Sequence, residues 1–470
     1  MSGRSETGGA NFASVPQFLS SDPWLTAAYW YRWYGLRLNT VDLEGLPISG
    51  RKGDATFSPF VTEGIGFFRN FITYSAQAHL REVAWMHDPS LTVGILENLA
   101  KCQRDDGSFP GHNYSARPPR DFYHADFATG TSRLDRLHGV AADERVLSTL
   151  ERYAEYFIRE RRMPAYPDEP DIGVGIFLIF DQNETGQEYM SRYQFASEHA
   201  DKWEPFRVGG VDATTYMILL FEYLADTTKE ESWSRWSNGI RSALEQMCRA
   251  DRFFFDNYEG RRSPAEPATG FYPFLLKHLG MYPRELIEAM YQRLLSPNCF
   301  WLPKGFPATT RNDATFSGEG EWKEKRLNCP WNGRSWPMVN SHLVDALANV
   351  ARQVRGSRAQ GELCSHAAEA LMKAIRLMFH HGDPTRPNSY EHYDPVTGLP
   401  ALYRGYDDYM HSWIVDLILR HAVGVVPGED FVDPLPLDVD WIECTNIPHP
   451  RGRMDVRIER GCSPAVLIRE

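Results

Sequence analysis

Apolar residues recur at helical spacing along most of the 470-residue chain. In "DERVLSTLERYAEYFIRERR" (143–162) they return every three or four residues, which is the pattern of a helix with one buried face. An Asp-Pro pair predicts the start of a further, aromatic helix at 22–35. The dominant element is therefore an α-helix of a few turns, and the same spacing predicts helices over 91–103, 214–228, 232–250, 284–295, 339–355, 366–380 and 408–424.

The connections between these helices alternate between short and long. Segments 104–132 and 300–338 are long and rich in Gly, Pro, aromatic and charged residues. Long loops without secondary structure are uncommon unless they carry function, so we expect them to gather at one rim. Helical hairpins joined by long loops at one end predict a closed ring of helix pairs around a cleft.

The two ends of the chain depart from the helical pattern. Residues 1–20 are rich in Ser and Gly and predict a flexible tail. Residues 36–60 alternate and are broken by Gly and Pro, which indicates a β-hairpin or an irregular excursion. Pro-punctuated alternation in 426–470 predicts a small β-rich tail packed on the helices. The sequence therefore predicts one large helical domain over 21–425.

Composition limits the partners of the protein. Hydrophobic residues at 42% and charged residues at 24% are ordinary for a globular protein with a sizeable core. The formal net charge of −12 argues against a nucleic acid or an anionic membrane as partner, because both require clustered Lys and Arg. A small neutral or cationic partner fits better. The oligomeric state stays open.

The cysteines and histidines indicate neither a disulfide framework nor a metal site. The seven cysteines are scattered without a C-x-x-C pair, which suits a reducing compartment. The N-terminus has no apolar signal core, and no run of 18 apolar residues occurs, so we expect a cytoplasmic protein. The histidines lack ligand spacing and no phosphate-loop signature is present. We therefore expect no metal and no cofactor.

Aromatic residues are unusually frequent in polar surroundings. The chain holds 13 Trp and 22 Tyr, and in "CPWNGRSWP" (329–337) Trp331 and Trp336 flank an Asn-Gly-Arg loop. Any single Trp is most often a core residue. Repeated Trp-polar-Trp clusters instead indicate a cleft whose walls stack on sugar rings, and a lipid or terpene pocket is the alternative. The Asp-rich clusters of a terpene cyclase are absent from the sequence.

Two glutamates are candidates for acid–base chemistry on a sugar. Hydrolysis of a glycosidic bond needs one carboxylic acid to protonate the leaving oxygen and one carboxylate on the opposite side. Glu188 stands in "ETGQEYMSRY" (184–193) and Glu391 in "YEHYDPVTG" (390–398). A solvated loop Glu is the plain alternative for each. To act as an acid, Glu188 needs a raised pKa, from partial desolvation or a neighbouring carboxylate such as Glu184.

At these residues the sequence resembles a known group of glycosidases. "ETGQEYMSRY" resembles the "ESGWDFSSRW"-type motif of trehalases and processing α-glucosidases, glycoside hydrolase families 37 and 63, with Glu188 at the place of the general-acid Asp. "GGVDATTYMILLFEYLA", "PWNGRSWP", "YEHYDPVTG" and "HSWIVDLI" are similar to the next motifs of the group and follow in the same order. Upstream, Thr73-Tyr74 replaces the Trp-Asp pair of the first motif. The chain ends resemble the mannosylglycerate-hydrolase-like bacterial branch.

This resemblance implies a fold and a set of roles. The fold is an (α/α)6 toroid, all-α apart from the β-rich tail, in which Glu188 is the general acid and Glu391 the general base. The activity is an inverting exo-glycosidase acting on a short, α-linked glucoside or mannoside. Helix capping for Asp212, a structural salt bridge for Arg192 and core packing for the tryptophans are the alternatives. The substrate-binding residues implied are Tyr74, Arg192, Asp212, Trp331, Asn332, Trp336 and Trp413.

Two other functions on the same fold stay open. A sugar epimerase or isomerase would use histidine pairs, and His342 and His411 are the candidates near the cleft. A carbohydrate-binding barrel without catalysis is the non-enzyme alternative, and the change from Asp to Glu at position 188 is its best argument.

Overall fold

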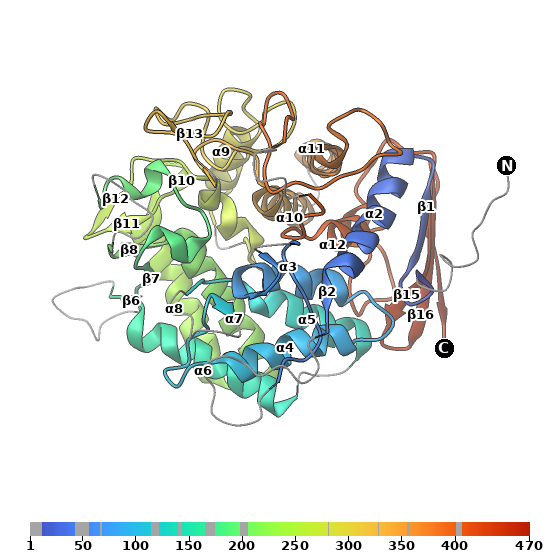
Figure 1. The fold of residues 1–470 in the computed structure, drawn as a ribbon, viewed down its shortest axis with the longest axis horizontal. Helices are drawn as coiled ribbons and strands as arrows, with labels where there is room; N and C mark the ends of the chain where they lie inside the picture. Colours follow the sequence, from blue (N-terminus) through green and yellow to red (C-terminus); the bar gives the residue numbers. More distant parts are fainter. Residues whose placement is uncertain are drawn as a thin grey trace.

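The computed structural model describes residues 12–42, 56–65, 68–113, 122–139, 143–164, 174–197, 205–280, 282–327, 329–354, 358–400 and 407–470, and it is rich in helices (Figure 1). One set of helices forms the interior, and in α3 (Thr73–Val83) every residue is buried. A helix that faces protein on all sides is expected to be buried in this way. The other interior segments are α5 (Phe127–His138), α7 (Val211–Thr228), the 3₁₀ helix η5 (Ala268–Leu275), α10 (Pro337–Gln353) and α12 (Ile414–Leu417).

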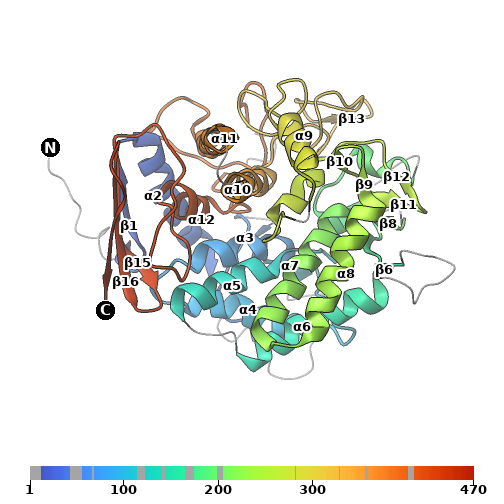
Figure 2. The same cartoon turned by 180° about the vertical axis from the view of Figure 1, so that it is seen from behind.

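The interior segments contact one another in a closed order. Helix α3 packs on α5, α5 on α7, α7 on η5, η5 on α10, α10 on α12, and α12 packs back on α3. Amphipathic helices lie outside them, and the pairs α7–α8 and α10–α11 run side by side (Figure 2). This arrangement is compatible with the predicted toroid. The outer helices are α2 (Pro23–Asn39), α4 (Ser90–Cys102), α6 (Glu144–Glu160), α8 (Glu231–Cys248), α9 (Arg284–Leu294) and α11 (Arg358–Arg376).

Most helices predicted from apolar spacing are confirmed within a few residues, and two differ in extent. Helix α11 begins at Arg358, ahead of the predicted 366, because the polar segment that opens it carries little apolar signal. The helix predicted at 408–424 is wrong in its first half. The N–H groups of Tyr409 and Met410 donate to the carbonyls of Ser389 and Glu63, 2.9 and 2.6 Å away, so helix α12 begins only at Ile414. It continues as the π-helical turn η7 (Ile418–Ala422).

The long loop predicted at 104–132 is shorter than expected, because α5 begins inside it. Phe127–His138 contains Gly and several Thr and Ser residues, which are weak helix formers, so the periodic signal is faint. Asp126 caps the helix by accepting the N–H of Thr129 at 3.0 Å. That cap is a signal in the sequence that could have located the helix. In the second long loop, strands β13 (Glu321–Trp322) and β14 (Lys325–Arg326) form a small hairpin.

Short strands join the loops around the helices, and strands of this length leave almost no trace in the sequence pattern. A sheet of order β12-β11-β8-β7-β6 includes β7 (Ile176–Ile179), the strand that leads into the segment of Glu188. The expected excursion at 36–60 is bounded by strands β2 (Thr40–Val41) and β3 (Phe60–Val61), which pair antiparallel, and its middle, 43–55, lies outside the described residues. The remaining strands of the large sheet are β6 (Arg162–Met163), β8 (Val208–Gly209), β11 (Asn257–Tyr258) and β12 (Arg261–Arg262).

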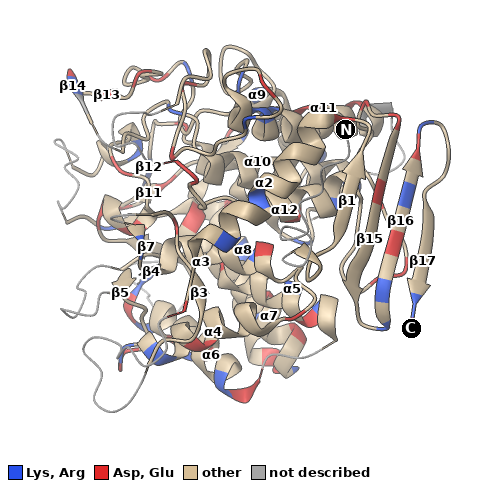
Figure 3. Cartoon of the chain, turned by 45° about the vertical axis from the view of Figure 1, so that its right-hand side comes forward, with Lys and Arg blue, Asp and Glu red and all other residues tan. Residues whose placement is uncertain are grey.

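The β-rich tail is present as a four-stranded antiparallel sheet of order β1-β15-β16-β17. Charged residues recur along β16 (Figure 3), where Arg457 pairs with Glu443 and Glu459. The flexible tail predicted at 1–20 is wrong at its end, because Gln17–Ser20 form β1 against β15 with Phe18 fully buried opposite Cys444. Its first part, 1–11, lies outside the described residues. The other strands are β15 (Trp441–His449), β16 (Gly452–Glu459) and β17 (Ala465–Arg469). Within the described residues, each helix is too short or too polar to cross a membrane.

Candidate active site

Several predicted site residues lie at the amino ends of the interior helices. Tyr74 is the second residue of α3 and Asp212 the second residue of α7, while Trp336 and Trp413 immediately precede α10 and α12. His124, just ahead of α5, approaches Asp212 with 3.6 Å between Nε2 and Oδ2. The amino ends of helices carry partial positive charge, so a carboxylate in the first turn, such as that of Asp212, is favoured in its ionised form.

The segment of Glu188 is a tight, buried loop between the 3₁₀ turns η3 (Gln182–Thr185) and η4 (Ser191–Tyr193). Gly186 has φ +62°, and a Cβ there would lie 2.8 Å from the Tyr74 ring, so glycine is required both by conformation and by space. Tyr189, directly after Glu188, also has φ +62°, a conformation that costs free energy in a non-glycine residue. Only 6% of Glu188 is exposed. The loop therefore holds a mostly desolvated carboxyl group on a fixed backbone.

The carboxylate next to Glu188 is a residue that the sequence did not indicate. Glu184 pairs with Arg161, whose Nη1 lies 2.8 Å from its carboxylate, and this pair holds the loop. Glu63 lies close enough to Glu188 for the two charges to repel. Burial, with a contribution from Glu188, raises the pKa of Glu63 above its usual value, against the hydroxyls of Ser75 and Tyr409 that donate to it.

Arg192 is a fully buried clamp between two acids. Its Nε and Nη2 donate to Asp256 at 2.7 and 3.0 Å, and its Nη1 and Nη2 donate to Asp212 at 2.9 and 3.0 Å. Every guanidinium nitrogen is thus engaged by protein carboxylates. Burial disfavours the charged form of Asp212, but Arg192 and His124 outweigh it and hold the pKa of Asp212 well below its usual value. Gly210, not Asp212, is the N-cap of α7.

The two tryptophans of the Asn-Gly-Arg loop stack on each other. The rings of Trp331 and Trp336 are 3.7 Å apart and inclined by 6°, and both are almost completely buried. The backbone N–H of Trp331 donates to the backbone carbonyl of Glu188 at 3.1 Å, so one end of the stack is bonded to the segment of Glu188.

The other end of the stack lies against the segment of Glu391. Ser335, next to Trp336, exchanges two backbone hydrogen bonds with Tyr393, at 2.8 and 2.9 Å. The ring of His392 lies 4.6 Å from that of Trp336, and its Nδ1 accepts from Arg334 Nε at 2.8 Å. Glu391 itself is 4% exposed. The stack therefore connects the two candidate carboxylate segments.

Asn332 and Trp413 are buried and bonded to the protein. The Nδ2 of Asn332 donates to the carbonyls of Thr315 and Glu321, both at 2.6 Å, which fixes the long loop. Trp413 donates from Nε1 to Asp345 at 3.0 Å, and the guanidinium carbon of Arg81 lies over its indole ring, 3.9 Å from the centroid. Both residues position the surroundings of the candidate site.

Polar atoms without well-formed hydrogen bonds gather around Tyr74. Among the described residues, the hydroxyls of Tyr74 and Tyr272, the Oε1 of Gln187 and the Nδ1 of His124 are buried and complete no such bond with protein. Both hydroxyls face Gln187, the residue before Glu188. Buried polar atoms are normally satisfied, so this cluster is suited to receive the hydroxyls of a ligand. Of these residues, only Tyr74 was singled out from the sequence.

Beneath this cluster, His342 is locked in one hydrogen-bonding role. Its Nδ1 lies 2.9 Å from the carbonyl of Met338 and must therefore donate, so its Nε2 accepts from Tyr216, also at 2.9 Å. The ring stacks on Tyr272 with 4.3 Å between centroids. Burial lowers the pKa of His342 to about 3, which keeps it neutral. The pKa of His411 is also lowered by burial.

Within the described ranges, no three His, Cys, Asp or Glu side chains are grouped so as to hold a metal ion. The residues that the sequence missed, namely Glu63, His124, Gln187, Asp256 and Tyr272, come from five separate segments. Gln187 stood inside the quoted motif, so its position beside Glu188 was the one available signal. The other four are brought near only by the packing of helices.

A buried constellation of carboxylates, tyrosines and stacked tryptophans in a helix-rich domain is typical of enzymes that cleave glycosidic bonds. Residues 70–412 match the family described as the mannosylglycerate hydrolase MGH1-like glycoside hydrolase domain, and the chain belongs to this family. The protein is therefore a glycoside hydrolase. A search of curated protein sequences found no match.

Solved structures with a similar fold share little sequence with the chain. A structure described as a sialidase has a TM-score of 0.74 at 17% identity, and the alignment covers 96% of this chain but only 40% of that chain. The GH63 mannosylglycerate hydrolase from Thermus thermophilus, in complex with Tris and D-glycerate, has a TM-score of 0.56 at 16% identity over 83% of this chain and 99% of that chain. An α-L-rhamnosidase from Streptomyces avermitilis has a TM-score of 0.54 at 14% identity over 95% and 36%.

Proposed function

We propose that the protein is an inverting exo-glycosidase on an (α/α)6 toroid and that it cleaves a short, α-linked glycoside. The closed order of contacts from α3 around to α12 supports the toroid. The observation that carries the function is the Trp331–Trp336 stack, which is bonded to the segment of Glu188 at one end and packed against that of Glu391 at the other. Two acids that must act from opposite sides of one bond need such a fixed connection.

In the proposed reaction, Glu188 gives its proton to the glycosidic oxygen as the bond between that oxygen and the anomeric carbon breaks. Glu391 takes a proton from a water molecule, whose oxygen forms the new bond to the anomeric carbon from the opposite face. The products are the free sugar with inverted configuration and the released alcohol. An inverting pair leaves room for this water, so we expect the carboxyl groups to lie ~6.5–9.5 Å apart.

The polar atoms around Tyr74 are the proposed contacts of the sugar that is released. Tyr74, Tyr272 and Gln187 present buried groups without well-formed protein partners, and His124 adds a ring nitrogen. Arg192 and Asp212 contribute by holding each other and α7 in place, and Asn332 by fixing the long loop. The similar structure from Thermus thermophilus is a mannosylglycerate hydrolase, so the substrate class that we propose is an α-mannoside or α-glucoside with a small aglycone.

The test is hydrolysis of aryl α- and β-glycosides and short disaccharides, with the product anomer followed by NMR. We expect inverted product from an α-linked substrate, and the loss of turnover in Glu188→Gln and Glu391→Gln while sugar binding persists. Retained configuration would overturn the inverting mechanism. Binding of sugars without turnover in the wild type would assign the chain to a carbohydrate-binding role.

A further inference from the structure

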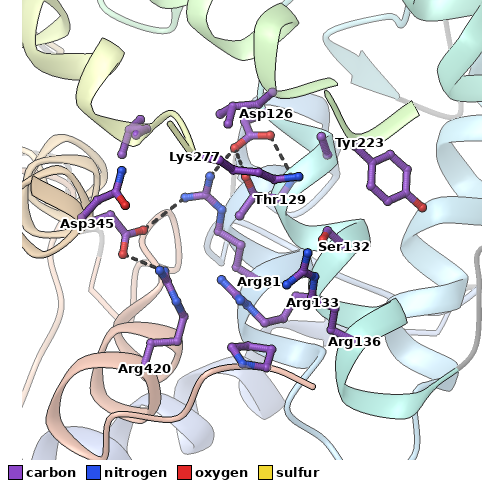
Figure 4. Close-up of a pocket in the computed structure, with 15 residues that line it drawn as sticks. Arg81, Asp126, Thr129, Ser132, Arg133, Arg136, Tyr223, Lys277, Asp345 and Arg420 are labelled. Carbon is purple, nitrogen blue, oxygen red and sulfur yellow. Dashed lines mark hydrogen bonds and ion pairs between the residues drawn. The ribbon is translucent and has the colours of Figure 1, made fainter. Parts of the chain in front are cut away.

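A polar cavity lies between the interior helices. It has a volume of about 270 Å³, and its walls come from α3, α5, α7, α10 and η7 (Figure 4). Neither candidate catalytic glutamate lines it. The volume is slightly below the ~300–1,000 Å³ of ordinary small-molecule sites, which suits a compact ligand.

The walls are dominated by cationic side chains. Arg81, Arg133, Arg136, Lys277 and Arg420 line the cavity, against the two carboxylates of Asp126 and Asp345. Three more acids stand behind the wall: Asp416 pairs with Arg133 at 2.9 Å, Asp226 with Lys277 at 2.6 Å, and Asp135 accepts from Tyr223 at 2.7 Å. Acids therefore hold the cations in place, while the cations supply most of the charged lining.

The bonds to these acids do not use every nitrogen of Arg81 and Arg420. Arg420 reaches Asp345 and Asp416, at 2.7 and 3.3 Å, through Nη1. Arg81 bonds Asp126 at 2.5 Å through Nη2, and its Nη1 lies 3.9 Å from Asp345. Within the described residues, its Nε and Nη1 complete no hydrogen bond. Asp345 thus lies between Arg81 and Arg420 (Figure 4).

Two accessible cations, Arg136 and Lys277, line the mouth of the cavity. Arg136 is exposed in the last turn of α5 and takes part in no ion pair with the described part of the chain. Lys277 is also accessible, with 38% of its side chain exposed. Burial lowers the pKa of Arg133 to about 10, and the cations of Arg420 and Arg81 act in the same direction against Asp416, which raises it. An oxyanion in the cavity would accept from several cations at once.

We propose that this cavity binds a small oxyanion of the phosphate class, either free phosphate or the phosphate group of a monoester. Guanidinium groups held by acids behind them present planar pairs of donors that match phosphate oxygens. The cavity lies behind the candidate active site, because Arg81 and Asp345 both contact Trp413, and Trp413 contacts His342 beneath the tyrosine cluster. The proposal is independent of which glycoside the enzyme cleaves.

The test uses the full chain in sodium phosphate, in glucose 6-phosphate, and in sodium chloride at matched ionic strength, with affinity measured by calorimetry and thermal shift. Arg136→Gln removes a cation without leaving an acid unpaired. Its matched control is Arg37→Gln, which removes an exposed arginine in the last turn of α2. We expect saturable binding at one site, weakened about tenfold by Arg136→Gln and unchanged by Arg37→Gln.

Lys277→Gln serves as the second variant and should also weaken binding. Tighter binding of glucose 6-phosphate than of phosphate would assign the site to a monoester, and the reverse to free phosphate, and both support the proposal. Absence of saturable binding, or equal affinity in all variants, would overturn it. The basic residues would then serve only to offset the negative carboxyl ends of the interior helices.

Discussion

The rings of Trp331 and Trp336 stack on each other, and each tryptophan contacts a different segment that carries a candidate acid. The backbone of Trp331 holds that of Glu188, while Trp336 packs on His392 beside Glu391. The stack is nearly inaccessible, so we propose that it fixes the spacing of the two acids.

Removing either ring should therefore disturb both stability and catalysis. We expect Trp336→Ala to lower the free energy of unfolding by about 3–5 kcal/mol, as for other buried aromatic residues. The kcat of the remaining folded enzyme should fall as well, because the acids lose their common support. Trp441→Ala in the terminal sheet, where the side chain is 36% exposed, is the control and should cost less than about 1 kcal/mol. Equal losses in the two variants, by chemical denaturation, would contradict this account.

The length of the side chain at position 188 offers a second test. Glu188 stands where the resembling glycosidases have Asp, so its carboxyl group reaches one methylene further. We expect Glu188→Asp to lower kcat by about 100-fold, because a displacement of about 1 Å spoils proton transfer. Glu188→Gln should lose about 10²–10⁴-fold or more. An Asp variant as active as the wild type would show that the loop does not fix the reach of the acid.

Glu63 should make the stability of the protein depend on pH. Burial, with a smaller contribution from the charge of Glu188, raises the pKa of Glu63 in the folded protein above the unfolded value of about 4.3. The folded state therefore keeps the proton longer, and this part of the stability is lost as the pH rises through the folded pKa. Glu63→Gln should remove this part of the pH dependence of the free energy of unfolding, whereas Glu231→Gln, at an exposed position of α8, is the control and should leave it unchanged. An unaltered pH dependence in Glu63→Gln would contradict this account.

Arg192 should matter for folding before it matters for chemistry. Arg192→Met leaves Asp212 and Asp256 buried without their counter-ion, which typically costs about 3–5 kcal/mol. Arg457→Met provides a matched control, because Arg457 also lies between two acids but on the exposed face of the sheet. There the loss of stability should be much smaller, because water screens exposed ion pairs. A small loss for Arg192→Met, measured by urea denaturation, would contradict the structural role.

The buried histidines predict a loss of stability in mild acid. Burial lowers the pKa of both His79 and His342 to about 3 in the folded protein, whereas the unfolded value is near 6.5. The unfolded state therefore binds protons first, and the stability present above pH ~6.5 is lost as the pH falls toward ~3. Each histidine should lower the free energy of unfolding by about 2 kcal/mol between pH 6.5 and pH 5. Denaturation of His79→Gln at both pH values should show a flatter dependence, and an unchanged slope would contradict the assignment.

The fold could be predicted well from the sequence where helices are strongly amphipathic, as at α6 and α8. The prediction failed where a capping residue rather than apolar periodicity marks a helix, as at Asp126. It also failed where a strand is too short to show alternating apolar and polar residues, as at β7. The segment of residues 408–413 has helical spacing, but its backbone groups are bonded to Ser389 and Glu63, so tertiary contacts override the local preference.

The residues of the candidate site could be predicted only in part from the sequence. Glu188, Tyr74 and the tryptophans stand in recognisable motifs, whereas Glu63 and Tyr272 stand in none and reach the site through packing. The motif marks Arg192 as a candidate, but only the structure shows that Asp212 and Asp256 bond all of its guanidinium nitrogens.

Strand β1 pairs with β15, which joins Gln17 to Thr445 across almost the whole chain. During synthesis on the ribosome, the first strand emerges long before its partner exists, and contacts of such large sequence separation form late. Until β15 is made, Phe18, which is buried in the folded protein, lacks its neighbour Cys444. We expect nascent chains that stop before residue 441 to expose this apolar edge, so premature termination should yield chains that chaperones retain, even with the interior helices complete.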